Sequence, residues 1–568
     1  MPNLKHLIRL TLSIFISVMC FAQLPATATE YYVNPAIGND NNSGTSKDAP
    51  IKSLDKAKRI KLQAGDKLLF AAGKTYWGSL VLNNLKGSAD KPIIVSTYMD
   101  DNNSDDAHAK IIARGLLKGI EVVNSSHLQI SNFIVTANGG GVYKWQQKLW
   151  DKQNGKKKTM MRVGVYVEAN KGNNTYSGIT FKNMLVRDIF FHDPGKSRSR
   201  AETASAMGTE AYGWGFRFFT KGKAKLNNVT VDNSIVYNVA HTGIKFNGVK
   251  GNLDNVTLSN NQVLKTGGPG MQMSGVTNAH VFNNKVDESG STNDTRKWGR
   301  GSGMWTWGSS HILVEHNQFL NANGPADSAG FHIDFNCDNV IVQYNLSANN
   351  AGGFIEILGN NYNNAYRYNV SVNDGHRVKK KGVAFQEGKT FWLSGFNGKN
   401  KPHNGPFNSY IYNNTIYVSD EIVSKIAVTR MAKGALVANN IFHIVGDSKL
   451  VKGDQYRPES NGTNHISDVI FTNNIFLKQS NWPKQVLIQD QAPVIADVAF
   501  TNPGSQLIGD YTPQNTDVIA NKGIEIPFIP GDDKGLFKAL TVKHDILGNP
   551  IVDKPDIGAI EISAKANQ

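Results

Sequence analysis

The 568-residue sequence predicts an all-β fold, a right-handed parallel β-helix. A short strand that ends in Asn recurs along the chain, and its apolar residues alternate with the period of two that is typical of strands. Successive copies, marked by Asn233, Asn261, Asn284, Asn317 and Asn345, are 28, 23, 33 and 28 residues apart. Each spacing suits one coil of two or three short strands. Repeats that stack in this way need no domain boundaries, so the chain length does not imply several domains.

The repeated Asn residues are predicted to build the solenoid. An Asn side chain tolerates left-handed backbone angles at a tight bend and bonds to nearby backbone. Amides stacked on successive coils can also form a ladder. The copies lie at residues 128–134, 229–235, 256–263, 280–286, 312–317, 340–345, 366–370, 410–416, 436–441 and 470–475.

A second repeated pattern carries the candidate chemistry. Each copy contains Gly and then a strand in which inward apolar residues alternate with outward polar or aromatic residues. Because this pattern lies on a different face from the Asn residues, we expect it to line a groove. The copies lie at residues 241–246, 268–273, 301–307, 328–334 and 350–356.

The first residues have the features of a secretory signal. Lys5 and Arg9 precede an apolar run over residues 10–22, and Ala26-Thr27-Ala28 gives a small-x-small cleavage pattern. We expect a secreted or periplasmic protein, since no later segment approaches membrane-spanning length. The expected organisation is a signal peptide at 1–28, an N-terminal cap and first coils at 29–80, a β-helix with a catalytic groove at 81–480, and final coils with a C-terminal cap at 481–568. The N-terminal cap is predicted to include a short amphipathic helix over 53–62.

Cysteine usage and charge restrict the class of partner. Removal of the signal leaves Cys337 as the sole cysteine, which excludes an intramolecular disulfide. The formal net charge of +15 favours anionic partners. Because no nucleic-acid-binding motif is present, an acidic glycan is the expected partner rather than nucleic acid. The sequence predicts no oligomeric state.

A segment at 142–162 interrupts the repeat. It contains Trp145, Trp150 and the run Lys156-Lys157-Lys158. Two interpretations stay open: a basic loop that forms a substrate wall over the groove, or a solvated insertion.

Asp334 and Glu356 are the predicted catalytic residues. Each follows an Ile after the Gly of its coil, and the two are 22 residues apart, close to one short coil. Adjacent coils of a β-helix lie about 4.8 Å apart. Two outward carboxylates in one column would then be roughly 5 Å apart, near the ~5–5.5 Å of a retaining glycosidase and below the ~6.5–9.5 Å of an inverting one. Like charges this close should raise one pKa and so create a general acid.

These two strands resemble the β-helix xylosidases of glycoside hydrolase family 120. The resemblance implies Asp334 as the nucleophile and Glu356 as the acid/base, but not xylose specificity, because the rest of the chain departs from that family. Residues 31–80 resemble the opening of exported β-helix carbohydrate-active enzymes, including polysaccharide lyases of the chondroitinase B type. The tail at 554–561 resembles their closing strand. Both terminal resemblances concern architecture and not the reaction.

Neighbouring side chains in the same pattern suit a sugar site. Exposed aromatic faces stack on pyranose rings, a histidine can bond a hydroxyl, and a line of cations can bind carboxylates or sulfates. Packing in the core or plain solvation are the alternatives for each. The predicted substrate-binding residues are His332, Trp305, Trp307, Arg377, Lys245 and Trp214.

Three functions stay open. A retaining glycoside hydrolase is favoured and requires no cofactor. A polysaccharide lyase would act on a uronate-containing glycan by β-elimination, with Ca²⁺ bound by Asp334, Glu356 and Asp338, and with Lys245, His332 or Arg377 as base or neutralising group. A non-catalytic glycan-binding β-helix would need no paired acids.

Overall fold

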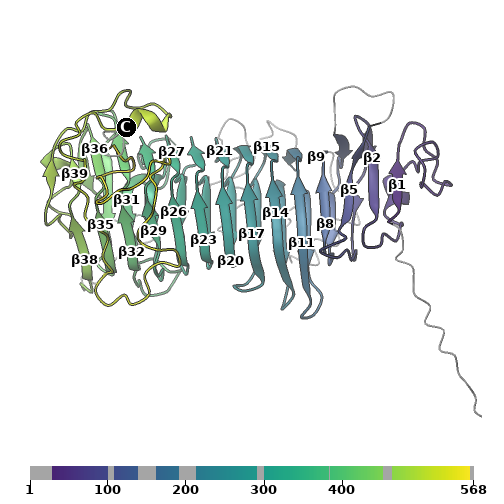
Figure 1. Cartoon of the computed structure of the whole chain (residues 1–568), viewed down its shortest axis with the longest axis horizontal. Coiled ribbons are helices and arrows are strands. Elements are labelled where there is room, and N and C mark those ends of the chain that lie inside the picture. The colour runs from purple at the N-terminus through teal and green to yellow at the C-terminus, as the bar shows by residue number, and fades with distance from the viewer. Residues whose placement is uncertain are drawn as a thin grey trace, which may run out of the picture.

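The computed structural model describes residues 28–99, 108–138, 162–190, 213–290, 300–382, 384–451 and 464–562. Within these ranges the chain forms three long parallel sheets that run along an elongated solenoid (Figure 1). Each coil adds one strand to each sheet in turn, which confirms the predicted right-handed parallel β-helix. The predicted signal segment, except residue 28, and the predicted loop at 142–162, except residue 162, lie outside the described residues.

Each coil passes through the three sheets in the same order, from sheet 1 to sheet 2 to sheet 3. Sheet 1 contains β1 (Glu30–Val33), β2 (Lys67–Ala71), β5 (Ile93–Tyr98), β8 (Leu128–Ser131), β11 (Thr175–Lys182), β14 (Lys225–Asp232), β17 (Leu253–Ser259), β20 (Val276–Phe282), β23 (Ser310–Glu315), β26 (Asp338–Gln343), β29 (Ala365–Arg367), β32 (Phe407–Tyr412), β35 (Lys433–Ala438) and β38 (Ser467–Thr472). Sheet 2 contains β3 (Thr75–Trp77), β6 (Ala109–Ile112), β9 (Phe133–Asn138), β12 (Leu185–Phe190), β15 (Ile235–Val239), β18 (Gln262–Thr266), β21 (Lys285–Asp287), β24 (Gln318–Leu320), β27 (Leu346–Ala348), β30 (Val370–Val372), β33 (Thr415–Val418), β36 (Ile441–Ile444), β39 (Ile475–Phe476) and β40 (Val494–Ile495). Sheet 3 contains β4 (Leu80–Val81), β7 (Lys118–Val123), β10 (Arg162–Ala169), β13 (Gly213–Thr220), β16 (Ile244–Asn247), β19 (Met271–Ser274), β22 (Met304–Trp307), β25 (Phe331–Ile333), β28 (Gly353–Ile357), β31 (Lys389–Leu393), β34 (Ser424–Val428) and β37 (Ser448–Leu450).

The predicted Asn ladder runs through the interior at the bend between sheets 1 and 2. Each side chain donates from Nδ2 to Oδ1 of the Asn one coil further on, at 2.9–3.0 Å. Nδ2 also reaches backbone carbonyls of its own and the preceding coil, as Asn345 does at Gln343 and Val314. The ladder therefore satisfies buried backbone groups at the bends from Asn261 onward. On the preceding coil Ser234 takes this place, and Asn233, which was predicted to belong to the ladder, bonds instead to Asn183 in a separate, exposed column. Its members are Asn261, Asn284, Asn317, Asn345, Asn369, Asn414, Asn440 and Asn474.

A column of glycines explains why the second sequence pattern begins with Gly. At the bend into sheet 3, a Cβ on any of six stacked glycines would lie only 2.4–2.8 Å from the carbonyl oxygen of the glycine on the next coil. Contacts this short do not occur between real atoms, so only Gly allows the coils to stack here. The six glycines are Gly119, Gly164, Gly215, Gly243, Gly270 and Gly303.

The predicted capping helix over 53–62 is not confirmed. Helix α1 (Leu54–Ala57) is a single turn, capped by the Ser53 hydroxyl, which accepts from the Lys56 amide. Beyond it the backbone tightens into i to i−3 hydrogen bonds and then extends, so that Leu62 reaches the core without a helix. The described chain also has two short 3₁₀ helices, η1 (Gln479–Asn481) and η2 (Ile508–Tyr511). No helix within the described residues is long and apolar enough to cross a membrane.

The C-terminal segment after β40 runs back along the outside of the solenoid in irregular backbone (Figure 1). Leu536 and Leu540 pack against Tyr368 and Tyr412 of the sheet 1 side. The guanidinium of Arg367 donates to the carbonyls of residues 539 and 540. These contacts fix part of the segment to the sheet 1 side, and Tyr511, Ile546 and Ile560 pack against sheet 2. The candidate site lies on sheet 3.

Candidate active site

Outward side chains of sheet 3 form one continuous column. Lys245 pairs with Gln272, Gln272 with Trp305, and Trp305 with His332 on successive coils. On the next coil Ile333 pairs with Ile357, which sets His332 beside Glu356. The prediction that the second sequence pattern forms one face is therefore confirmed for these residues.

The predicted alignment of Asp334 beside Glu356 is wrong by two residues. The bridge between Ala329 and Gly353 and the pair of Ile333 with Ile357 both give an offset of 24 residues. Asp334 is therefore level with residue 358, and Glu356 lies diagonally from it. One coil spacing combined with two residues of strand separates their Cα atoms by roughly 8 Å, not 5 Å.

Asp334 occupies the end of β25, where the chain leaves sheet 3. Its amide donates to the Thr306 carbonyl at 2.9 Å, and its Oδ1 accepts from the Phe335 amide at 2.8 Å. Burial raises the pKa of Asp334 to about 7, and the negative charge of Asp327 acts in the same direction. The Phe335 hydrogen bond and the charge of Arg300 oppose this rise without cancelling it. Asp334 therefore holds a proton near neutral pH, as a general acid must.

Asp327 is a second carboxylate at this site, and sequence reasoning missed it. It lies in the turn between β24 and β25, and its Oδ2 is 3.6 Å from the Nε of Arg300. Its Oδ1 is buried and has no hydrogen-bond partner among the described residues. Buried polar side-chain atoms are usually hydrogen-bonded, so this oxygen makes Asp327 a candidate functional group. The sequence feature that could have identified Asp327 is its position: an acidic residue seven positions before Asp334, in the turn that precedes the same strand.

The backbone of Asp327 is held by a neighbouring loop. Its φ angle is +46°, in the left-handed region that non-Gly residues rarely adopt. The Gln386 side chain accepts from its amide at 2.5 Å, and the Arg377 guanidinium donates to its carbonyl at 2.9 Å. These contacts fix the backbone from which the Asp327 carboxylate reaches Arg300.

His332 lies within the same group. It is 3% exposed, and burial lowers its pKa to about 4, so the ring is neutral at neutral pH. Its Nδ1 lies 3.1 Å from the Ser302 hydroxyl, and its ring stacks on Trp305 with centroids 5.8 Å apart. A neutral imidazole in this position can donate one hydrogen bond and accept another.

Two tryptophans lie on the strand before Asp334. Trp305 is partly exposed, and Trp307 is 36% exposed with its ring edge-on to Phe335 at 5.9 Å. Both therefore present aromatic surface on the outer face of sheet 3, as predicted.

The remaining predicted residues lie elsewhere. Arg377 leaves the column and donates to the carbonyls of Gln386, Gly324 and Asp327 at 2.7–2.9 Å. Lys245 is 5% exposed and lies three coils from Asp334, and Trp214 is fully buried one coil further on. Structure thus brings Asp334, His332, Trp305, Trp307 and Glu356 together, and separates Lys245 and Trp214 from them.

The Ca²⁺ ligands expected for a lyase do not form a cluster. Within the described ranges, no three His, Cys, Asp or Glu side chains come close enough to hold a metal ion. Asp338, the third expected ligand, instead pairs with Lys250.

Comparison with known proteins agrees with this fold. Residues 218–397 match the family model described as a right handed beta helix region. A lacto-N-biosidase from Bifidobacterium longum subsp. longum is 25% identical to 95% of this chain. The crystal structure of a GH136 lacto-N-biosidase from Eubacterium ramulus superposes with a TM-score of 0.53 and 19% identity, over 74% of this chain and 68% of that one.

This chain spans 37% of the length of the Bifidobacterium protein. The Eubacterium structure supports the fold alone at its level of identity. Neither protein is described as a xylosidase or a chondroitinase, so the resemblance to those two families stays a prediction.

Proposed function

We propose that this chain is a glycoside hydrolase in which Asp334 is the general acid and Asp327 is the second catalytic carboxyl group. The observation that carries the proposal is the environment of Asp334, whose pKa rises to about 7 beside a second carboxylate that is paired with Arg300. Hydrolysis of a glycosidic bond requires one carboxyl group that donates a proton and a second that acts as nucleophile or base. The alignment with a lacto-N-biosidase over 95% of the chain supports the same reaction class.

We further propose that the reaction retains the anomeric configuration. Asp327 would attack the anomeric carbon while the bond to the leaving oxygen breaks and Asp334 donates its proton to that oxygen. Water would then attack the glycosyl-enzyme ester and give its proton to Asp334. A carboxylate that can attack the anomeric carbon and a carboxyl group that can donate a proton are the two groups that this mechanism requires.

Nearby side chains would position the sugar. Trp305 and Trp307 offer ring faces for stacking, and the neutral imidazole of His332 can bond a hydroxyl. Glu356, beside His332 on the next coil, is proposed to contact the same sugar ring. Lys245 and Trp214 would act only on a substrate that extends several coils.

The proposed substrate is an oligosaccharide, and the proposed location is outside the cytoplasm. The net charge of +15 supports a glycan with anionic groups, and the lacto-N-biosidase match supports an oligosaccharide that ends in lacto-N-biose. The segment at 1–28 supports export to the periplasm or beyond. Both substrate types belong in the first assay.

A single assay separates the reaction classes. The purified protein is incubated with lacto-N-biosyl and uronate-containing oligosaccharides, while reducing ends and ultraviolet absorbance are followed together. We expect reducing ends without new absorbance, and NMR of the first product should show the anomer of the substrate. Absorbance that rises with the reducing ends would identify a β-elimination and overturn the proposal.

Variants test the assignment of the acids. Asp334→Asn and Asp327→Asn should each lower kcat by about 10³-fold or more, since each removes one of the two chemical groups. Asp338→Asn is the matched control, because Asp338 lies on the next strand and pairs with Lys250 outside the group. Asp334→Asn with activity near that of the control would refute the role of Asp334.

A further inference from the structure

A cavity of about 310 Å³ lies at the bend between sheets 2 and 3, beside the turn that carries Asp327. Its walls come from three successive coils: Asn323, Gly324 and Pro325 precede β25, Ala351 precedes β28, and residues 376–378, 381 and 384 precede β31. This volume lies at the lower end of the range of ligand pockets, about 300 Å³ and above. It therefore suits a single sugar unit.

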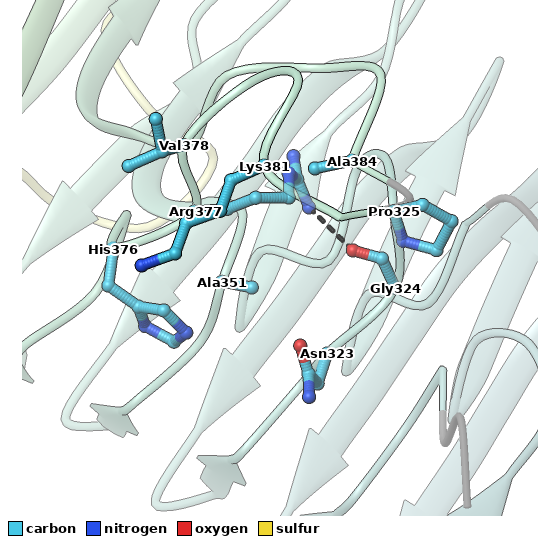
Figure 2. Close-up of a pocket in the computed structure, with 9 residues that line it drawn as sticks. All are labelled: Asn323, Gly324, Pro325, Ala351, His376, Arg377, Val378, Lys381 and Ala384. Carbon is cyan, nitrogen blue, oxygen red and sulfur yellow. Dashed lines mark hydrogen bonds between the residues drawn. The ribbon is translucent and has the colours of Figure 1, made fainter.

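The cavity is structurally joined to the proposed catalytic residues. Figure 2 shows the Arg377 guanidinium bonded to the Gly324 carbonyl in the cavity wall, at 2.9 Å. The same guanidinium donates to the Asp327 carbonyl. One side chain thus fixes both the cavity wall and the backbone of Asp327, and the cavity lies directly beside that residue.

The electrostatic character of the cavity is positive. Its charged lining residues are Arg377 and Lys381, and no Asp or Glu is among the described residues that line it. Arg377 is engaged with carbonyl groups, whereas Lys381 is exposed and has no ion-pair partner within the described part of the chain. An ammonium group at the edge of a cavity without acids favours an anionic ligand.

The other polar lining groups suit sugar hydroxyls. The amide of Asn323 is exposed to the cavity and can both donate and accept. His376 is mostly buried, burial lowers its pKa, and its Nδ1 contacts the Asn373 carbonyl at 3.4 Å. A neutral His376 leaves its other ring nitrogen for a hydroxyl, and Val378, Pro325 and Ala384 supply apolar surface.

We propose that this cavity is a subsite for a sugar unit that carries a carboxylate or a sulfate, with Lys381 as the group that binds the anion. The assignment of the cavity to the substrate rests on the proposed glycoside hydrolase function. The binding of an anionic sugar does not, and it can be measured without turnover.

Ligand-observed NMR titration tests the subsite directly. Methyl glucuronoside, a 6-sulfated methyl glucoside and neutral methyl glucoside are titrated onto the full chain. We expect at least one of the anionic sugars to bind about tenfold more tightly than the neutral one, and the sugar that does so identifies the anion. Equal binding of all three would overturn the proposal.

Lys381→Gln and Lys379→Gln form a matched pair, because both remove one charge from the same loop but only Lys381 lines the cavity. Lys381→Gln should abolish the preference for the anionic sugar and Lys379→Gln should keep it. Loss of the preference in both variants would show a general field effect and overturn the subsite.

Asp334→Asn separates the two proposals. It should bind the anionic sugar as the wild type does while it fails to turn over substrate. Wild-type binding without turnover of any glycan would refute only the hydrolase, and turnover without a preference for the anionic sugar would refute only the subsite.

Discussion

The Arg377 guanidinium donates to the main-chain carbonyl of Asp327 at 2.9 Å, and the same side chain donates to Gly324 and Gln386. Gln386 in turn accepts from the Asp327 amide. Both polar groups of the Asp327 backbone are therefore bound to one loop, which explains how a left-handed backbone with φ +46° is maintained there. Arg377 was predicted to bind substrate, but its geometry fits a residue that positions Asp327.

Replacement of Arg377 by Lys should lower kcat by about 10²-fold, since a displacement of about 1 Å in a reacting group has that effect. Lys cannot donate to three carbonyls in the planar arrangement of a guanidinium. If Asp327 moves away, its charge no longer raises the pKa of Asp334, so the basic limb of the pH–rate profile should shift to lower pH. Steady-state kinetics across pH measures both effects.

Arg367→Lys provides the control for a loss of stability alone. Arg367 is equally buried and also donates to carbonyls, at residues 539 and 540, but on the side of sheet 1. The Arg367→Lys variant should lower the melting temperature without shifting the basic limb of the pH–rate profile. A pH profile of Arg377→Lys identical to that of Arg367→Lys would contradict the positioning role.

The wild-type pH profile follows from Asp334. Its pKa of about 7 requires that activity fall as the pH rises above about 7, because the general acid then loses its proton. Asp327→Glu, which keeps the charge but moves it, should retain a basic limb near that of the wild type at reduced kcat. Activity that rises through pH 8 would be inconsistent with Asp334 as the acid.

Asp334 should also destabilise the folded state at high pH. The pKa of Asp334 is higher in the folded chain than the ordinary value of 3.8, so its protonation stabilises the folded state. This contribution to the free energy of unfolding is complete below pH 3.8 and is lost as the pH rises through about 7. Asp334→Asn removes the buried charge, so it should raise stability at pH 8 by about 1 kcal/mol or more. Thermal unfolding at pH 5 and pH 8 measures this; the gain should be smaller at pH 5, and a loss of stability at pH 8 would contradict the burial of the charge.

The sequence predicted the stacking of the coils more reliably than the register of one coil on the next. Ile355 and Ile357 both point inward, so a slip of two residues preserves the alternation that identifies a strand, whereas a slip of one would not. Periodicity therefore could not decide whether Asp334 or His332 lies beside Glu356. Gly352 and Gly353 added to the ambiguity, because either could match Gly330.

Periodicity in the sequence could not identify Asp327 either. It lies in a turn, where no alternation marks which side chains face the site, and its orientation depends on Arg377 and Gln386, which are about fifty or more residues away in the sequence. The Asn ladder was predictable because one residue type repeats at one place in eight successive coils, from Asn261 to Asn474. A site assembled once, from loops of different coils, leaves no such repeat.

The ladder itself yields the last prediction. Asn345→Ala should lower the free energy of unfolding by about 2–4 kcal/mol, because the Asn345 side chain bonds to Asn369 and to the carbonyls of residues 314 and 343 in the interior. Removal would take this side-chain donor from the carbonyls of residues 314 and 343, and would take the Oδ1 acceptor from the buried Asn317 backbone amide. Asn255→Gly is the control: it removes an exposed amide bond to Asn228 and keeps a residue suited to the φ of +53°. Denaturant unfolding should find the control within about 1 kcal/mol of the wild type, and a similarly small effect of Asn345→Ala would show that the ladder marks the bends without stabilising them.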